Sequence, residues 1–261
     1  MTWVIGRAVP FGYAVGLSDI RVTLKNGTEI TEIDCLQKIY KVGNQMVLGF
    51  AGSVAIGLEN VAQLSEALDV PERDGTWDSC YVAEMLPIGA RKLFNSFGRV
   101  EQECGCELIL LGAHPTENDG VAPKCYIYRF YAPEFEPIKS DRDEIVSIGS
   151  GSVNNYYVEA LKKLSNNYES YKLELGSVGS SSFGLMLSIS SMLRKLPVPG
   201  ISRHLHICIV RRDSVKLGTN NIETPDKPDI NFVMPPVAKN MEELKQIIKG
   251  SGELVLEGAT C

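Results

Sequence analysis

The fold is decided by the first stretch of the chain, MTWVIGRAVPFGYAVGLSDIRVT (residues 1–23). Residues 2–9 and 12–18 are rich in strand-forming side chains, and a Pro-Phe-Gly turn separates them. The pattern predicts a β-hairpin whose first strand starts at Thr2. Threonine is a good strand former, so Thr2 is an ordinary residue for this place. Its position also allows a second interpretation, because removal of Met1 would make it an N-terminal nucleophile.

Beyond this hairpin, strands and helices come in groups. Two more pairs of short strands are predicted before residue 53, with an Asn-Gly turn in one pair and a Gly-Asn turn in the other. The spacing of apolar residues then becomes helical. The expected helices are residues 53–68, about 77–97, 154–168 and 181–196, and the later strands are residues 106–114, 124–132 and 204–212. Grouped strands and paired helices indicate an α+β architecture of antiparallel sheets covered by helices, not a parallel α/β fold.

The 261 residues fit one large domain with an extension. We assign residues 1–218 to the main domain and residues 219–261 to the C-terminal extension, because the composition becomes polar and proline-rich there. The extension carries one amphipathic helix, NMEELKQIIKG. Asn240 is its expected N-cap, and Glu243 three residues later completes the pattern of a capping box.

Composition and charge exclude several classes of function. The net charge is -6 and the basic residues are scattered, so no nucleic-acid partner is expected. The longest apolar run, MVLGFAGSVAIGL, is too short and too rich in glycine to span a membrane. The stretch after Met1 has no features of a secretory signal. The seven dispersed cysteines indicate reduced thiols. We therefore expect a cytoplasmic protein with no membrane association.

An N-terminal threonine can combine two catalytic parts in one residue. Its hydroxyl attacks an acyl carbon, and its own α-amine accepts the proton. Because an α-amine titrates near neutral pH, it is a usable base under physiological conditions. A nearby cation, a carboxylate that positions the cation, and a backbone N–H for the oxyanion would complete such a site.

Further motifs follow Thr2 in a defined order: LSDIRVTLKNG, CLQKIYKV, VLGFAGSVAIG and VSIGSGSVNNYYVEAL. They supply an acidic-x-Arg-x-Thr segment, a lysine ahead of a strand, a glycine-rich strand-to-helix turn, and Gly-Ser-Gly before a helix. Together with the threonine, this set resembles the β-type subunits of the proteasome family, which are N-terminal nucleophile hydrolases. The match covers residues 2 to about 215.

The resemblance implies a four-layer αββα sandwich with antiparallel sheets. It implies a threonine-type endopeptidase that cleaves polypeptides or peptides through an acyl-enzyme on Thr2, exposed by removal of Met1. It also implies a homo-oligomeric ring that encloses the site. An ATP-dependent unfoldase partner is left open by the sequence, which has no nucleotide-binding motif of its own.

The resemblance also assigns five catalytic positions. Thr2 matches the nucleophile, and Lys38 matches the lysine whose charge lowers the proton affinity of the nucleophile. Asp19 matches the acid that orients this lysine. Gly49 matches the source of the oxyanion-binding N–H, close to a helix start that favours negative charge. Ser150 matches the serine that is hydrogen-bonded to the terminal amine.

Four more positions match substrate binding. Arg21 and Thr23 fall in the segment whose backbone pairs with an extended peptide by strand addition. Val47 and Ala51 would flank the pocket for a substrate side chain, which implies an apolar preference.

The chain departs from the family pattern just before its last predicted strand. Family members usually carry an aspartate there and, three residues later, a serine, both close to the threonine amine. Here the stretch reads KLPVPGISRHLH, with neither residue in register. Ser202 or a water molecule is therefore expected to take part of the role.

Each catalytic position also has a plainer interpretation. Asp19 and Lys38 fit a surface ion pair, which would contribute little to stability. Gly49 fits close packing against a neighbouring element, and Ser150 fits a helix N-cap. Two other functions stay open, namely a catalytically inactive structural homologue and an N-terminal nucleophile amidohydrolase that acts on small amides.

Neither a cofactor nor a metal is expected. His204, His206 and Cys208 would share one face of a strand, but packing is a better interpretation than a zinc site. Cys104 and Cys106 have no second pair of ligands at the spacing of a zinc site.

Overall fold

The computed structural model describes residues 2–9, 11–26, 28–70, 76–141, 144–171, 178–221 and 232–250. The strands are β1 (Trp3–Val9), β2 (Tyr13–Asp19), β3 (Arg21–Asn26), β4 (Glu29–Asp34), β5 (Ile39–Gly43), β6 (Met46–Gly52), β7 (Cys106–Asp119), β8 (Ala122–Tyr131), β9 (Ile138–Lys139), β10 (Ile145–Gly149), β11 (Leu205–Arg211) and β12 (Val215–Thr219). The helices are α1 (Val54–Leu68), α2 (Ser79–Ser96), α3 (Arg99–Glu103), α4 (Asn155–Tyr171), α5 (Val178–Lys195) and α6 (Met241–Gly250), with a 3₁₀ helix at Ser150–Val153.

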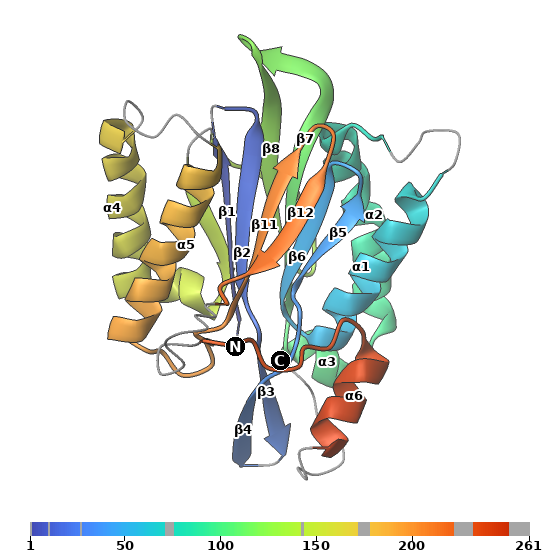
Figure 1. Ribbon diagram of the computed structural model, residues 1–261. Helices are drawn as coiled ribbons and strands as arrows, with labels where there is room; N and C mark the ends of the chain where they lie inside the picture. Colours follow the sequence, from blue (N-terminus) through green and yellow to red (C-terminus); the bar gives the residue numbers. More distant parts are fainter. Residues whose placement is uncertain are drawn as a thin grey trace.

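Two five-stranded antiparallel sheets form the centre of the molecule. The first sheet has the strand order β10-β1-β2-β11-β12, and the second has the order β5-β6-β7-β8-β9. Helices α4 and α5 cover the outer face of the first sheet, and α1 and α2 cover that of the second (Figure 1). The four-layer α+β architecture expected from the sequence is therefore confirmed.

Three apolar clusters fill the three interfaces between these layers. Val4 and Ile109 belong to the cluster between the two sheets. Trp3 packs under the helices of the first sheet, where its ring stacks on Tyr157 at a centroid distance of 4.6 Å. Phe50 belongs to the cluster under α1 and α2. Every residue of β1 and β2 is buried, because this hairpin has packed layers on both of its faces.

A short two-stranded sheet, β3–β4, projects from the end of the sandwich that carries Thr2 (Figure 1). Its strands flank the predicted Asn-Gly turn, and the ladder runs from Asn26–Glu29 back to Arg21–Asp34. Strand β12 was not expected from the sequence. It has exposed and polar positions because it is the edge strand beside β11.

The described part of the C-terminal extension packs against the main domain. Ala238 forms an isolated parallel bridge with Leu36, and Leu244 and Ile248 of α6 are buried in the cluster under α1 and α2. The helix begins with the predicted capping box, since the Glu243 N–H donates to Asn240 Oδ1 at 2.9 Å. The proposed domain boundary at residue 218 stays a prediction.

The cysteines differ from expectation at one position, because Cys104 forms a disulfide. The other described cysteines are free thiols. Within the described ranges, no group of three or more His, Cys, Asp or Glu side chains could hold a metal ion. Of the helices that the structure describes, none combines the length and apolarity needed to cross a membrane.

Candidate active site

The candidate site is built where three strands of the first sheet end together. Thr2 directly precedes β1, and the ladder places Trp3 opposite Gly149 at the end of β10. On its other side β1 pairs with β2, which ends at Asp19. The antiparallel register therefore brings segments from three parts of the chain to Thr2.

Lys38 reaches Thr2 from the second sheet, where it directly precedes β5. Its Nζ lies 2.9 Å from Thr2 Oγ1, and 3.2 Å and 3.4 Å from the two carboxylate oxygens of Asp19. Exposed fractions are 3% for Thr2, 0% for Asp19 and 1% for Lys38. The Asp19–Lys38 contact is therefore a buried ion pair that faces a threonine hydroxyl, and the surface ion pair considered above is wrong.

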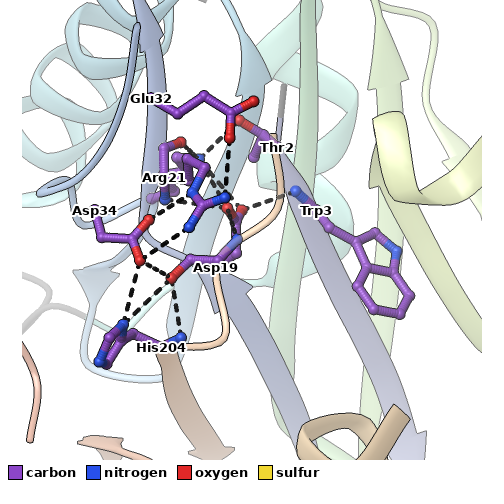
Figure 2. A network of polar contacts seen from close by, with 9 residues as sticks. Thr2, Trp3, Asp19, Arg21, Glu32, Asp34 and His204 are labelled. Carbon is purple, nitrogen blue, oxygen red and sulfur yellow. Dashed lines mark hydrogen bonds and ion pairs between the residues drawn. The ribbon is translucent and has the colours of Figure 1, made fainter. Parts of the chain in front are cut away.

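Backbone groups fix the carboxylate of Asp19. The Trp3 N–H donates to Oδ1 at 2.9 Å, and the N–H groups of Arg21 and Ser202 donate to Oδ2 at 3.1 and 3.3 Å (Figure 2). Lys38 also donates to the carbonyl of Arg21. Burial lowers the pKa of Lys38, and the negative charge of Asp19 opposes that effect. The pair is therefore held rigidly, with the lysine pointing at Thr2 Oγ1.

Ser150 binds the main chain of Thr2 in both directions. Its Oγ accepts a hydrogen bond from the Thr2 nitrogen at 3.1 Å and donates to the Thr2 carbonyl at 3.1 Å. This nitrogen is the amide joined to Met1, and an amine would stand in its place after cleavage of that bond. The N-cap interpretation of Ser150 is wrong, because Gly149 occupies the cap position of the 3₁₀ helix and no side chain caps it.

Gly149 lets this turn approach Thr2 closely. Its φ angle is +83°, and an added Cβ would lie 2.1 Å from the Thr2 carbonyl oxygen and 3.0 Å from Cβ of Ala51. Its N–H donates to a carboxylate oxygen of Glu107 on β7 at 2.8 Å. Ala51, the second-last residue of β6, therefore lies beside Thr2 together with the end of β10.

The oxyanion role expected for Gly49 does not fit the backbone. Phe50 donates its N–H to the Lys38 carbonyl, on the β5 side of β6, at 3.1 Å. Because N–H groups alternate in direction along a strand, the N–H of Gly49 points to β7, where Ile109 is its ladder partner. The sheet takes up this N–H, so the expectation for Gly49 is wrong.

The N–H of Gly52, unlike that of Gly49, does not point to β7. Its N–H points to the same side as that of Phe50, but β5 begins only at Ile39 and does not extend opposite Gly52. Its φ angle of +91° turns the chain from β6 into α1. Ser53 then caps this helix, with its hydroxyl accepting from the Ile56 N–H at 3.3 Å. The sequence points to this position through the Ala-Gly-Ser step that directly precedes the helix.

The two residues predicted to flank the side-chain pocket, Val47 and Ala51, lie at different distances from Thr2. Val47 and Ala51 are fully buried in the layer between the sheets. Ala51 lies near Thr2, as described above. Val47 stands four residues away, about 13 Å along the strand, so it does not flank the same site. The expectation for Val47 is wrong.

Arg21 and Thr23 were expected to pair with an extended substrate by strand addition, and Arg21 does not fit that role. The N–H and carbonyl of Arg21 are engaged by Asp19 and Lys38, so Arg21 does not offer its backbone to a substrate. Backbone groups of alternate residues share a direction, so those of Thr23 also point away from β4. Pairing of a substrate with Thr23 stays a prediction.

Ser202 lies at the site but not in the expected role. Its hydroxyl donates to Asp34 at 2.6 Å, whereas its backbone N–H is the group that contacts Asp19. Sequence reasoning missed Asp34 and Glu107. Neither belongs to a motif, and their contacts depend on how distant segments meet.

Comparison with known proteins agrees with this architecture. No family model matches the sequence, and no curated protein matches it. Among solved structures, Anbu (ancestral beta-subunit) from Yersinia bercovieri is similar, with a TM-score of 0.58 and 17% sequence identity. The similarity covers 86% of this chain and 89% of that chain. The two proteins share one fold. At this identity the likeness shows the fold alone, so any chemistry has to be argued from the site itself.

Proposed function

We propose that the protein is a proteasome-like threonine peptidase, in which Thr2 becomes the nucleophile once its bond to Met1 is cleaved. One observation carries the proposal, the buried contact of Lys38 with both Thr2 Oγ1 (2.9 Å) and the Asp19 carboxylate (3.2 Å). A lysine in a dry interior is costly unless its charge is compensated. Here it is compensated by one carboxylate and directed at one hydroxyl, an arrangement that suits activation of that hydroxyl.

The reaction proceeds through an ester on Thr2. Thr2 Oγ1 attacks the carbonyl carbon of the substrate amide while its proton passes to the α-amine of the same residue. The hydrogen bond from Lys38 stabilises this oxygen as it loses the proton. The protonated amine then gives its proton to the leaving nitrogen, and the C–N bond breaks. Water, deprotonated by the same amine, hydrolyses the ester and restores the threonine.

Gly52 supplies the N–H for the oxyanion in this proposal. The direction of its N–H and its place at the start of α1 support the assignment, because a helix N-terminus stabilises negative charge. The backbone of Thr23 pairs with an extended polypeptide substrate, and Ala51 lies against its side chain. The motif resemblance to β-type proteasome subunits supports a homo-oligomeric ring around the site.

The test is intact mass spectrometry of the purified protein with and without a β-lactone directed at N-terminal threonine. We expect loss of Met1 and one covalent adduct, and no adduct in Thr2→Ala. Lys38→Met should slow adduct formation by about 100-fold or more, because a buried group aimed at the reacting atom is lost. Lys41→Met is the matched control, since Lys41 is exposed on β5, three residues after Lys38.

Other outcomes would contradict the proposal in distinct ways. A retained Met1 with no adduct would identify a catalytically inactive homologue. An adduct together with turnover of small acyl amides, but not of peptides, would identify an amidohydrolase. A monomer mass in native mass spectrometry would contradict the ring.

A further inference from the structure

A second carboxylate, that of Asp34, gathers side chains next to the Thr2 site. Arg21 donates to its two oxygens through Nε at 2.7 Å and Nη2 at 3.3 Å. The hydroxyl of Ser202 donates to Oδ2 at 2.6 Å, and His204 Nδ1 lies 3.3 Å from the same oxygen. The contacts join β4, β3 and the segment before β11, as Figure 2 shows. Asp34 therefore ties three parts of the chain together.

Asp34 is held in its charged form. Burial alone would raise its pKa, but hydrogen bonds from Arg21 and Ser202 and the charge of Arg21 together lower it. A charged carboxylate binds these donors more strongly than a neutral acid does. The cluster is thus a defined arrangement at neutral pH.

Two of the residues whose side chains bind Asp34 also contact Asp19 or Lys38 through their backbones. Arg21 and Ser202 each present their backbone N–H to the same oxygen of Asp19, at 3.1 and 3.3 Å. Arg21 also presents its carbonyl to Lys38. Asp34 thus fixes two side chains whose own backbones supply three hydrogen bonds to Asp19 and Lys38.

The neighbouring ion pair between Glu32 and Arg21 serves as a comparison, because it joins only β3 and β4. Glu32 lies two residues before Asp34 on β4 and binds Nη1 of Arg21 at 2.9 Å. Its side chain is 26% exposed, and no other partner of its carboxylate is seen in the described part of the chain. The Asp34 side chain is exposed to a similar extent, 20%, so exposure does not separate the two carboxylates. Asp34 differs because it also holds Ser202, which is fully buried and 168 residues away in sequence.

We propose that Asp34 is a positioning residue of the Thr2 site, which fixes Arg21 and Ser202 so that their backbones orient Asp19 and Lys38. The inference rests on the proposed function for its role in catalysis. The orientation of Lys38 can be tested without any turnover.

The first experiment compares Asp34→Asn with Glu32→Gln as matched control. Both changes remove one negative charge from the same strand and from the same arginine. We expect Asp34→Asn to slow β-lactone labelling of Thr2 by about tenfold, because a small displacement of reacting groups is costly in rate. Glu32→Gln should label at the wild-type rate. Equal rates for the two variants would overturn the proposal.

The second experiment observes Lys38 directly by NMR, in protein labelled with ¹³C at lysine Cε. The Lys38 signal is the one that disappears in Lys38→Met. Burial lowers the pKa of Lys38, and the carboxylates of Asp19 and, more weakly, Asp34 oppose that effect. Asp34→Asn removes a charge that acts on Lys38 directly, so the variant that reports positioning is Ser202→Ala, which keeps every charge. We expect a shifted Lys38 titration in Ser202→Ala, because Asp19 is no longer held in its orientation, and an unchanged one in Glu32→Gln. An unchanged Lys38 titration in Ser202→Ala would overturn the proposal.

The two readouts separate this inference from the proposed function. If the wild-type protein forms no adduct but the Lys38 signal responds to Ser202→Ala, the peptidase proposal fails and the positioning stands. If Asp34→Asn does not fold, Ser202→Ala takes its place in the labelling experiment. It keeps the backbone N–H to Asp19 and removes the hydroxyl, which donates to Asp34 at 2.6 Å and accepts from the His204 N–H at 2.9 Å. It should slow labelling in the same direction, and wild-type labelling in that variant would overturn the proposal.

Discussion

At the scale of single residues, a buried lysine and a half-buried histidine meet opposite conditions. Lys38 has a fully buried carboxylate beside it, so its charge is compensated. His206 has no such partner, and its Nδ1 is buried without a hydrogen bond among the described residues. Burial, with a smaller effect from Lys239, lowers the pKa of His206 to about 4. The histidine is therefore neutral in the folded protein at pH 7.

This difference predicts a pH dependence of stability. The unfolded chain binds a proton on His206 near pH 6.5, while the folded protein does so only near pH 4. Stability should therefore fall as the pH drops from 6.5 towards 4, by at most about 3 kcal/mol from this group. Urea unfolding at pH 7 and pH 4.5 measures it, with His206→Gln as the comparison. A loss of stability that is equal in both proteins would contradict the assignment to His206.

At the scale of elements, the candidate site depends on a link between the two sheets. Glu107 on β7 accepts the N–H of Gly149 at the end of β10, at 2.8 Å. The next residue, Ser150, binds both the nitrogen and the carbonyl of Thr2. Glu107 therefore holds, from the second sheet, the turn that holds Thr2 in the first.

We predict that Glu107→Leu slows β-lactone labelling of Thr2 by about tenfold, because the Ser150 turn loses its anchor. Glu107→Gln should label almost as fast as wild type, since its amide oxygen can still accept the Gly149 N–H. Rescue by glutamine separates a positioning hydrogen bond from a requirement for charge. Slow labelling in Glu107→Gln would contradict the role given to this hydrogen bond.

Much of the arrangement of strands and helices can be predicted from the sequence. Grouped strands and paired helices gave the fold class, because hydrophobic period and turn residues are local signals. The motif order also placed Asp19, Lys38 and Ser150 around Thr2. The proposed oxyanion position, Gly52, could not be predicted with the same rule, since shifting from Gly49 to Gly52 changes the side to which an N–H points.

Asp34 and Glu107 were outside the reach of sequence reasoning for another reason. Each meets its partner across a large sequence separation, 168 residues for Asp34 and Ser202 and 42 for Glu107 and Gly149. Such meetings depend on the register of several ladders at once, which local patterns do not contain.

At the scale of the whole molecule, the C-terminal extension braces the loop that carries Lys38. Ala238 donates its N–H to the Cys35 carbonyl at 2.7 Å and accepts from the Gln37 N–H at 2.9 Å, directly before Lys38. Further back, the ring of Phe232 stacks on His204 at a centroid distance of 4.3 Å. The extension thus contacts the site's surroundings on two sides.

We predict that Phe232→Ala lowers the free energy of unfolding by about 1 kcal/mol and slows β-lactone labelling, because His204 loses the ring that packs on it. Val233→Ala is the control, since Val233 is 54% exposed and is the adjacent residue. Urea unfolding and labelling rates measure both effects. Equal behaviour of the two variants would show that the extension does not support the site through this contact.

The residues of the site lie far apart in the sequence, so the site can be complete only late in translation. Thr2 is made 148 residues before Ser150 and 200 before Ser202, whose N–H holds Asp19. At roughly 5–20 residues per second, translation takes roughly 10–40 s to cover that distance. β11 must also join β2 before the first sheet is whole. A nucleophile of the proposed kind would therefore stay inert on the ribosome until Ser202 had emerged, which would keep it from cleaving neighbouring nascent chains.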